Sequence, residues 1–142
     1  MKKLLIVDDD NSIIDGLAKM ASHIGPYDIK TTVSGLFAID IIKQYRPEII
    51  ITDFILPQFN GMQLLELCQK EFPKIQVILA TGFPTSEFIQ SAMKKGAIDI
   101  LKKPFRREDL QKSLLIAEKL LNLSTQNSNL KNELEFLINK PI

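Results

Sequence analysis

The stretch Leu4-Leu5-Ile6-Val7-Asp8-Asp9-Asp10 passes directly from an unbroken apolar run to three consecutive acids. Later apolar runs also lead to polar residues: Ile49-Ile50-Ile51-Thr52 before Asp53, Val77-Ile78-Leu79-Ala80 before Thr81-Gly82, and Ile100-Leu101 shortly before Lys103-Pro104. Short apolar runs separated by helical patterns indicate buried parallel strands. Ligands of an open parallel sheet bind outside the carboxyl ends of its strands. We therefore expect three acids, a hydroxyl and an ammonium group to meet in one crevice, which suits a divalent cation and a phosphoryl group.

The segments between these runs carry apolar residues at helical spacing, with capping residues and helix breakers at their ends. The boundary signals are Gly25-Pro26, Ser34, Pro47, Asn60-Gly61, Pro73, Gly96 and a last helix start near Arg107. Five strands alternating with five helices predict an α/β fold, a five-stranded parallel sheet with helices on both faces. The flavodoxin-like order 2-1-3-4-5 fits best, because the partly polar second strand, at residues 28–33, then lies at an edge.

The composition describes one domain with a full apolar core and excludes several classes of protein. The chain has 142 residues, 45% of them hydrophobic, and no apolar run long enough to cross a membrane. Its 18 Lys and Arg against 17 Asp and Glu give no strong attraction to nucleic acid, so we expect no direct nucleic-acid contact. The start does not have the pattern of a signal peptide, and the single Cys68 cannot support a disulfide scaffold. We therefore expect a cytoplasmic protein.

The C-terminal part of the chain differs in character from the rest. Residues 1–121 are predicted to form the domain, and residues 122–142 a helical extension that acts as a linker or a coiled coil. From the last helix of the domain into this extension, a row of mostly apolar residues is spaced alternately four and three apart. This heptad seam consists of Ile116, Leu120, Leu123, Asn127, Leu130, Leu134 and Leu137. A single Asn at such a seam favours two parallel strands, in which the two Asn127 side chains hydrogen-bond each other. We expect either a homodimer through this helix or a simple linker with accidental leucine spacing.

The residues at the strand ends, taken together, resemble the receiver domain of bacterial two-component response regulators, the CheY-like family. The resemblance covers about residues 1–121 and rests on Asp8-Asp9-Asp10, on Asp53 followed by Pro57 and Gly61, on Thr81-Gly82 and on Lys103-Pro104-Phe105. It implies a signalling phosphoacceptor domain rather than an enzyme, one that assists its own phosphorylation and dephosphorylation. A sensor histidine kinase would be the phosphoryl donor.

The resemblance also implies the metal ligands. Asp9 and Asp53 would bind Mg²⁺ directly, Asp8 through a water, and Ile55 by its backbone carbonyl. Carboxylates and carbonyl oxygens are the donors that this hard cation prefers.

The phosphoryl group has its own set of implied residues. Asp53 would be the phosphoacceptor, Thr81 and Lys103 would contact the phosphoryl oxygens, and the Lys103–Pro104 peptide bond would be cis. Mg²⁺ and the Lys103 ammonium would together cancel the repulsion between a carboxylate and an anionic donor.

The sequence departs from the family pattern at three positions. Receivers usually carry an aromatic residue three positions before the Lys, and here that position is Ile100. The rotating aromatic switch of the family is therefore not expected in its usual form. The positions two after the acceptor and two after the Thr are Ile55 and Phe83, which cannot orient an attacking water. A long-lived phosphorylated state is the resulting hypothesis.

Several functional alternatives stay open from the sequence. The chain is either a stand-alone receiver that acts by protein contact or the N-terminal receiver of a longer regulator. Residues 92–97, the Lys103 turn and the 129–134 segment are similar to receivers that precede the ATPase module of enhancer-binding transcription activators. A haloacid-dehalogenase-type phosphatase is a remote alternative, because Asp8-Asp9-Asp10 contains its D-x-D pattern. That class would leave Asp53 and the Lys103 turn unexplained.

Overall fold

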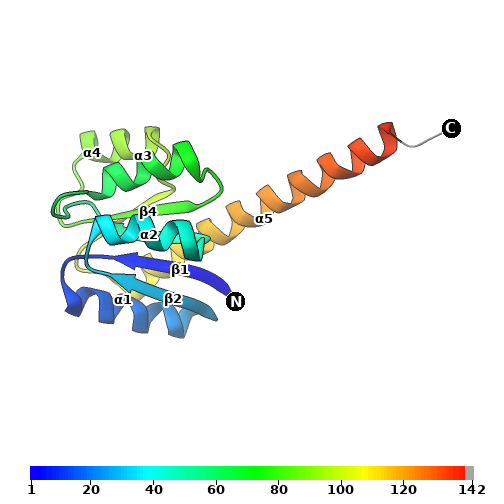
Figure 1. Ribbon diagram of the computed structural model, residues 1–142. Coiled ribbons are helices and arrows are strands. Elements are labelled where there is room, and N and C mark those ends of the chain that lie inside the picture. The colour runs from blue at the N-terminus through cyan, green and yellow to red at the C-terminus, as the bar shows by residue number, and fades with distance from the viewer. Residues whose placement is uncertain (140–142) are drawn as a thin grey trace.

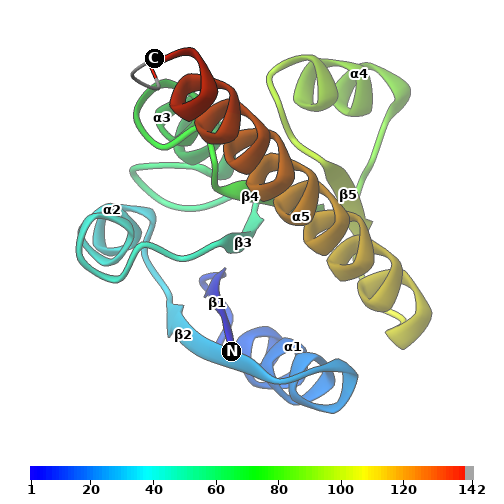
Figure 2. The ribbon, with the colours of Figure 1, turned by 90° about the vertical axis from the view of Figure 1, so that its right-hand side faces the viewer.

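Five parallel strands form one sheet in the computed structural model, which describes residues 1–139 apart from the side chains of Asn127 and Ser128. The strands are β1 (Lys2–Val7), β2 (Tyr27–Thr32), β3 (Ile49–Asp53), β4 (Gln76–Thr81) and β5 (Asp99–Lys102). Their order is β2-β1-β3-β4-β5, which confirms the predicted order (Figure 2). The partly polar β2 lies at an edge of the sheet, as its burial pattern requires.

The helices are α1 (Asn11–Ile24), α2 (Gly35–Tyr45), α3 (Gly61–Glu71), α4 (Ser86–Lys94) and α5 (Arg107–Ile138). Side-chain caps explain where most of them begin. Ser34 and Thr85 accept backbone hydrogen bonds at the starts of α2 and α4. Asn60 and Gln63 form a reciprocal capping box at the start of α3. These caps fix the helix starts, which face the carboxyl ends of the strands.

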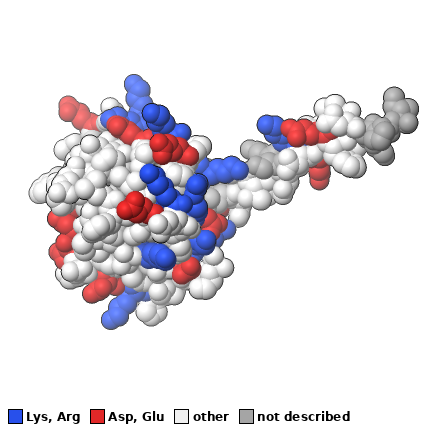
Figure 3. Space-filling model, in the orientation of Figure 1, with Lys and Arg blue, Asp and Glu red and all other residues white. Residues whose placement is uncertain are grey.

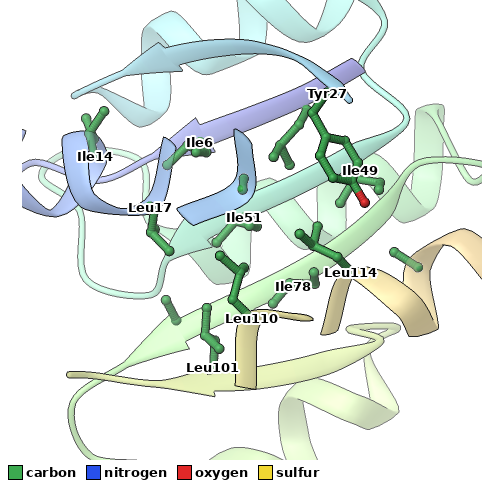
Figure 4. Close-up of a cluster of buried hydrophobic side chains, with 14 residues drawn as sticks. Ile6, Ile14, Leu17, Tyr27, Ile49, Ile51, Ile78, Leu101, Leu110 and Leu114 are labelled. Atoms are coloured by element: carbon green, nitrogen blue, oxygen red, sulfur yellow. The ribbon is translucent and has the colours of Figure 1, made fainter. Parts of the chain in front are cut away.

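The two faces of the sheet are covered by different helices (Figure 1). Alternate residues of β1 point to opposite faces, so Leu4 and Ile6 lie in one apolar cluster and Leu5 and Val7 in the other. The first cluster packs the sheet against α1 and α5, through residues such as Leu17 (Figure 4). The second packs it against α2, α3 and α4. Burial on both faces explains why the strands are continuous apolar runs.

The parallel register brings the ends of the central strands level with one another. Val7 pairs with Thr52, Asp53 with Ala80, and Thr81 with Lys102. The residues that follow these pairs therefore lie together at the carboxyl ends of the strands.

Helix α3 holds the end of β3 at close range. A Cβ atom at Gly61 would collide with the backbone carbonyl of Asp53, so this helix start can approach the strand only as glycine. The Gly61 N–H also donates to the carbonyl oxygen of Phe54. The backbone around Asp53 is fixed by packing as well as by the sheet.

Helix α5 is continuous from Arg107 to Ile138 and projects beyond the sheet (Figure 1). No break occurs at the polar stretch of residues 124–129, although its residues are poor helix formers. The Asn127 side chain, and with it the expected Asn–Asn hydrogen bond, lies outside the described part of the structure, as do residues 140–142 of the predicted extension.

The single cysteine gives a test of the core. Cys68 on α3 is fully buried, and burial raises the pKa of its thiol to about 12. Because the thiolate is the reactive form, a thiol reagent at neutral pH should modify the folded protein roughly a thousandfold more slowly than the unfolded chain. Absorbance or mass spectrometry can follow the labelling, with the denatured protein as control. Rapid labelling of the folded protein would contradict the packing of α3 on the sheet.

Candidate functional site

Three carboxylates meet at the carboxyl ends of β1 and β3. Asp8 and Asp9 directly follow β1, and Asp53 is the last residue of β3. One carboxylate oxygen from each lies within 4.8 Å of the others. Asp8 and Asp53 are buried, 1% and 8% exposed, whereas Asp9 is exposed to solvent. The structure therefore brings these three acids together at the carboxyl ends of the strands, as the sequence predicted.

The third acid of the run, Asp10, has a different task. Its carboxylate accepts hydrogen bonds from the Ser12 N–H at 2.9 Å and from the Ser12 hydroxyl at 2.8 Å, which makes it the N-cap of α1. The hydrogen bonds from Ser12 hold the pKa of Asp10 below its usual value. Asp10 is therefore tied to the helix and is not one of the three clustered acids.

Lys103 places an ammonium group between the two buried carboxylates. Its Nζ lies 2.8 Å from Asp8 Oδ2 and 3.1 Å from Asp53 Oδ2. The Lys103–Pro104 peptide bond is cis, as the family resemblance implied. The Lys103 N–H also donates to the carbonyl oxygen of Thr81 at 2.9 Å, which ties the loop after β5 to the end of β4.

The charges of this group depend strongly on one another. Burial raises the pKa of Asp53, and the neighbouring Asp8 charge adds to that rise, while contact with Lys103 and the Ile55 N–H oppose it. Burial alone would lower the pKa of Lys103, but its contacts with Asp8 and Asp53 outweigh burial and raise it. A cluster of net negative charge that is partly desolvated favours binding of a cation.

Thr81 is the last residue of β4, so it also lies at the carboxyl ends of the strands, and it is buried. Its Oγ1 accepts a hydrogen bond from the Phe83 N–H at 3.2 Å, so its hydroxyl proton remains available for another acceptor. Among the described hydrogen bonds, none joins Thr81 to the side chains of Asp53 or Lys103. The structure therefore places Thr81 at the carboxyl ends of the strands, with no described hydrogen bond from its side chain to the side chains of the charged cluster.

The loops after β3 and β4 carry exposed apolar side chains. Ile55 follows β3 and is 68% exposed, and Phe83 follows β4 and is 84% exposed. Neither side chain can donate or accept a hydrogen bond. The two loops beside the acids therefore present apolar surface to the solvent.

The donor set fits a hard divalent cation. Three carboxylates that approach within a few ångströms, two of them buried, offer the oxygen ligands that Mg²⁺ takes together with waters. The exposed Asp9 leaves one side of the cluster open to solvent and therefore to such waters.

One contact near the site was not predicted from the sequence. Phe54, the residue after Asp53, packs edge-to-face on Phe88 of α4 with ring centroids 4.7 Å apart. The Phe54 N–H donates to the carbonyl oxygen of Ala80. This pair links the loop after β3 to α4, whereas Ile100, where the family usually has an aromatic residue, is a half-buried aliphatic residue. An aromatic residue directly after Asp53 was the available sequence signal.

Clustered acids, a buried Thr and an ion-paired Lys at the carboxyl ends of a parallel sheet are the arrangement that the resemblance to signalling receiver domains implied. The family model described as "Response regulator receiver domain" matches residues 4–115. The chain belongs to this family, whose members are phosphorylated on an aspartate in two-component signalling.

Solved structures agree with the assignment. The receiver domain of NtrX from Brucella abortus is 30% identical, covers 84% of this chain and 98% of its own, and superposes with a TM-score of 0.73. A response regulator receiver domain protein from Clostridium thermocellum is 26% identical, covers 89% and 98%, and gives a TM-score of 0.78.

Curated relatives are longer than this chain. The transcriptional regulatory protein YesN of Bacillus subtilis is 33% identical over 122 residues, which are 83% of this chain and 33% of that protein. The chain thus spans about a third of that relative's length. Among the described residues, no helix is long and apolar enough to cross a membrane.

Adjacent acids allow a matched test of the metal site. Asp9→Ala should weaken Mg²⁺ binding by at least about tenfold, because even groups that only orient a ligand can cost that much. Asp9 makes none of the described side-chain hydrogen bonds, so the stability of the apo protein should not fall. Asp10→Ala should do the opposite, lowering stability through loss of the α1 cap with little effect on Mg²⁺ affinity.

Calorimetric Mg²⁺ titration and thermal unfolding of both variants measure these effects. The Mg²⁺ affinity of Asp8→Ala should lie between those of the two other variants. This substitution removes one carboxylate of the cluster and also a partner of Lys103. Equal Mg²⁺ affinity in the wild type and Asp9→Ala would overturn the assignment of Asp9 as a ligand.

Proposed function

We propose that this chain accepts a phosphoryl group from a sensor histidine kinase onto Asp53, in a Mg²⁺-dependent reaction, and then switches conformation to control an output partner or domain. The observation that carries the proposal is the contact of Lys103 with Asp53 at 3.1 Å inside a cluster of three carboxylates. Membership of the receiver family supports it.

The chemistry of the transfer explains why these groups are needed together. A carboxylate and an anionic phosphoryl donor repel each other. The acceptor therefore needs cationic groups beside the negatively charged equatorial phosphoryl oxygens. Mg²⁺, when bound by Asp9, Asp53, the Ile55 carbonyl and a water held by Asp8, would neutralise part of that charge. Lys103 would supply a second positive charge from the opposite loop.

Phosphorylation would break the contacts that Lys103 makes now. The Asp53 carboxylate would become an acyl phosphate, and the Lys103 ammonium would follow the phosphoryl oxygens, loosening its pairing with Asp8. Thr81 would donate its hydroxyl to a phosphoryl oxygen and draw the loop before α4 inward. The Phe54–Phe88 contact gives α4 a direct link to that movement.

Control of transcription is the output we propose, because the chain matches one part of longer regulators such as YesN and NtrX. A stand-alone receiver that acts through protein contact is the alternative. We also propose a cytoplasmic location, since response regulators are typically cytoplasmic. The proposed partners are a sensor histidine kinase and a second copy of the chain.

The acceptor assignment predicts a single site of modification. With Mg²⁺ and a small phosphodonor, the chain should gain one phosphoryl group, and Asp53→Asn should abolish that gain completely. Intact-mass spectrometry measures it, and loss of labelling on chelation of Mg²⁺ is the control. If Asp53→Asn is labelled normally while Asp8→Asn is not, the nucleophile is at β1 and a phosphatase-type chemistry replaces the receiver proposal.

The exposed apolar side chains after β3 and β4 predict slow loss of the phosphoryl group. Ile55 and Phe83 cannot hydrogen-bond an incoming water, so they cannot orient it toward phospho-Asp53. Replacing Ile55 by Asn and Phe83 by Glu should speed the decay by roughly tenfold or more. Phosphoprotein lifetime after removal of the donor is the readout, with Ile55→Val and Phe83→Leu as the apolar control. Unchanged decay in the polar variant would show that another group limits hydrolysis.

A further inference from the structure

A groove lies at the amino-terminal ends of the strands, where α5 leaves the domain (Figure 1). The start of β1, the loops at residues 46–48 and 71–75 and one side of α5 form its walls, and its volume is about 680 Å³. Sites that hold small molecules in proteins have volumes of about 300–1,000 Å³. The groove is therefore large enough for such a ligand.

The apolar part of the lining comes from three elements. Phe72, Pro73 and Ile75 belong to the loop between α3 and β4, Pro47 to the loop between α2 and β3, and Leu121 to α5. Ile75 is buried, and Leu121 packs against the core on the α1 and α5 side of the sheet. A ligand with an apolar body would gain by covering this surface.

Arg46 is held in a fixed position at the side of the groove. It follows α2 in the left-handed conformation, with φ of 53°. Its Nε–H donates to the carbonyl oxygen of Lys43 at 3.1 Å. Its Cζ lies over the Phe72 ring, 4.5 Å from the centroid. The stacking and the hydrogen bond together orient the guanidinium before any ligand binds.

The charge of Arg46 has no partner within the described part of the chain, since none of the described ion pairs includes it. Its Nη groups also appear in none of the described hydrogen bonds. Lys2 and Lys74 line the same groove and are likewise absent from those ion pairs. Three cationic side chains therefore face the groove without a described counter-charge.

Two acids also line the groove and reduce its positive charge. Glu48 accepts a hydrogen bond from the Lys3 N–H at 3.0 Å, and Glu71 is exposed to solvent. Three cations against these two carboxylates leave the described lining with a net positive charge. Figure 3 shows Lys and Arg side chains gathered on the side of the domain from which α5 projects. The groove therefore attracts a negatively charged group.

We propose that this groove binds a small amphipathic anion, an apolar or aromatic body that carries one carboxylate, sulfonate or phosphate group. The body would lie against Phe72 and Leu121. The acid group would accept hydrogen bonds from the Nη groups of Arg46, because the planar guanidinium matches two oxygens of such a group. The hydroxyl of Ser124 on α5 offers a further donor. The ligand would therefore contact the domain and α5 at the same time.

This site is separate from the acidic cluster. Lys2, Glu48 and Ile75 lie at or just before the starts of β1, β3 and β4, whereas Asp53 is the last residue of β3. The strand between Glu48 and Asp53 spans roughly 16 Å. The proposal goes beyond the phosphoacceptor function and does not rest on it, so Asp53→Asn should leave binding in the groove unchanged.

The first test separates the anionic group of the ligand from its apolar body. The probes are anilinonaphthalenesulfonate and phenylnaphthylamine, which is the same molecule without the sulfonate, and their fluorescence is titrated with the full chain. Arg46→Gln should weaken binding of the sulfonate by about tenfold or more, because it removes a charge-assisted contact. It should change the affinity for the neutral probe by less than about threefold, because the apolar lining remains.

Lys43→Gln is the matched control for charge. Lys43 is exposed at the same end of α2 and does not line the groove, so its loss should change neither affinity by more than about twofold in physiological salt. Equal binding of the sulfonate by the wild type and Arg46→Gln would overturn the proposal, as would an equal loss in Lys43→Gln. A wild type that binds neither probe at millimolar concentration would also overturn it and would leave the groove to a protein partner.

The second test locates the bound probe. Ser124→Phe places a large side chain in the groove from α5 and should abolish binding of both probes there. Gln126→Phe is the control, because Gln126 is exposed on the same helix and does not line the groove. Both variants keep the other exposed apolar side chains of the protein, so a difference between them reports on the groove alone. If both bind the probes as the wild type does, the probes bind elsewhere and the proposal is wrong.

Discussion

The Lys103 ammonium between the buried carboxylates of Asp8 and Asp53 is the interaction on which the site depends. Two partly desolvated like charges at the ends of neighbouring strands would repel each other, and the Lys103 cation, in the loop after β5, offsets that repulsion. Each partner comes from a different part of the chain, 95 residues apart for Lys103 and Asp8. The site therefore exists only when the whole parallel sheet has formed with its correct register.

The ion pairs of Lys103 do not neutralise the negative charge of the site. One ammonium faces three carboxylates, and the exposed Asp9 makes no described ion pair. A divalent cation would bring the group close to neutrality, and a phosphoryl group would then add negative charge that Lys103 can follow. Under the proposed function, Lys103 would exchange its carboxylate partners for phosphoryl oxygens when Asp53 is phosphorylated. Such an exchange would be the physical basis of a switch.

Much of the fold and of the acidic cluster could be predicted from the sequence, because burial on both faces of a parallel sheet makes the strands recognisable as apolar runs. The strand order followed from the weak β2, and the convergence of Asp8, Asp9 and Asp53 followed from the rule for strand ends. The ion pair of Asp8 with Lys103 and the capping role of Asp10 did not follow. They depend on backbone direction after β1, which turns Asp8 inward to Lys103 and Asp10 back onto Ser12. The Phe54–Phe88 contact depends on loop geometry that no local pattern records.

Helix α5 connects the Lys103 loop to the C-terminal end of the described chain. It begins at Arg107, a few residues after Lys103, and continues without a break to Ile138. Its first half is held by the core through Leu110 and Leu114, so a change in the Lys103 loop acts on a helix that is anchored to the sheet. A continuous helix transmits a small rotation or shift along its length, whereas a flexible linker would absorb it.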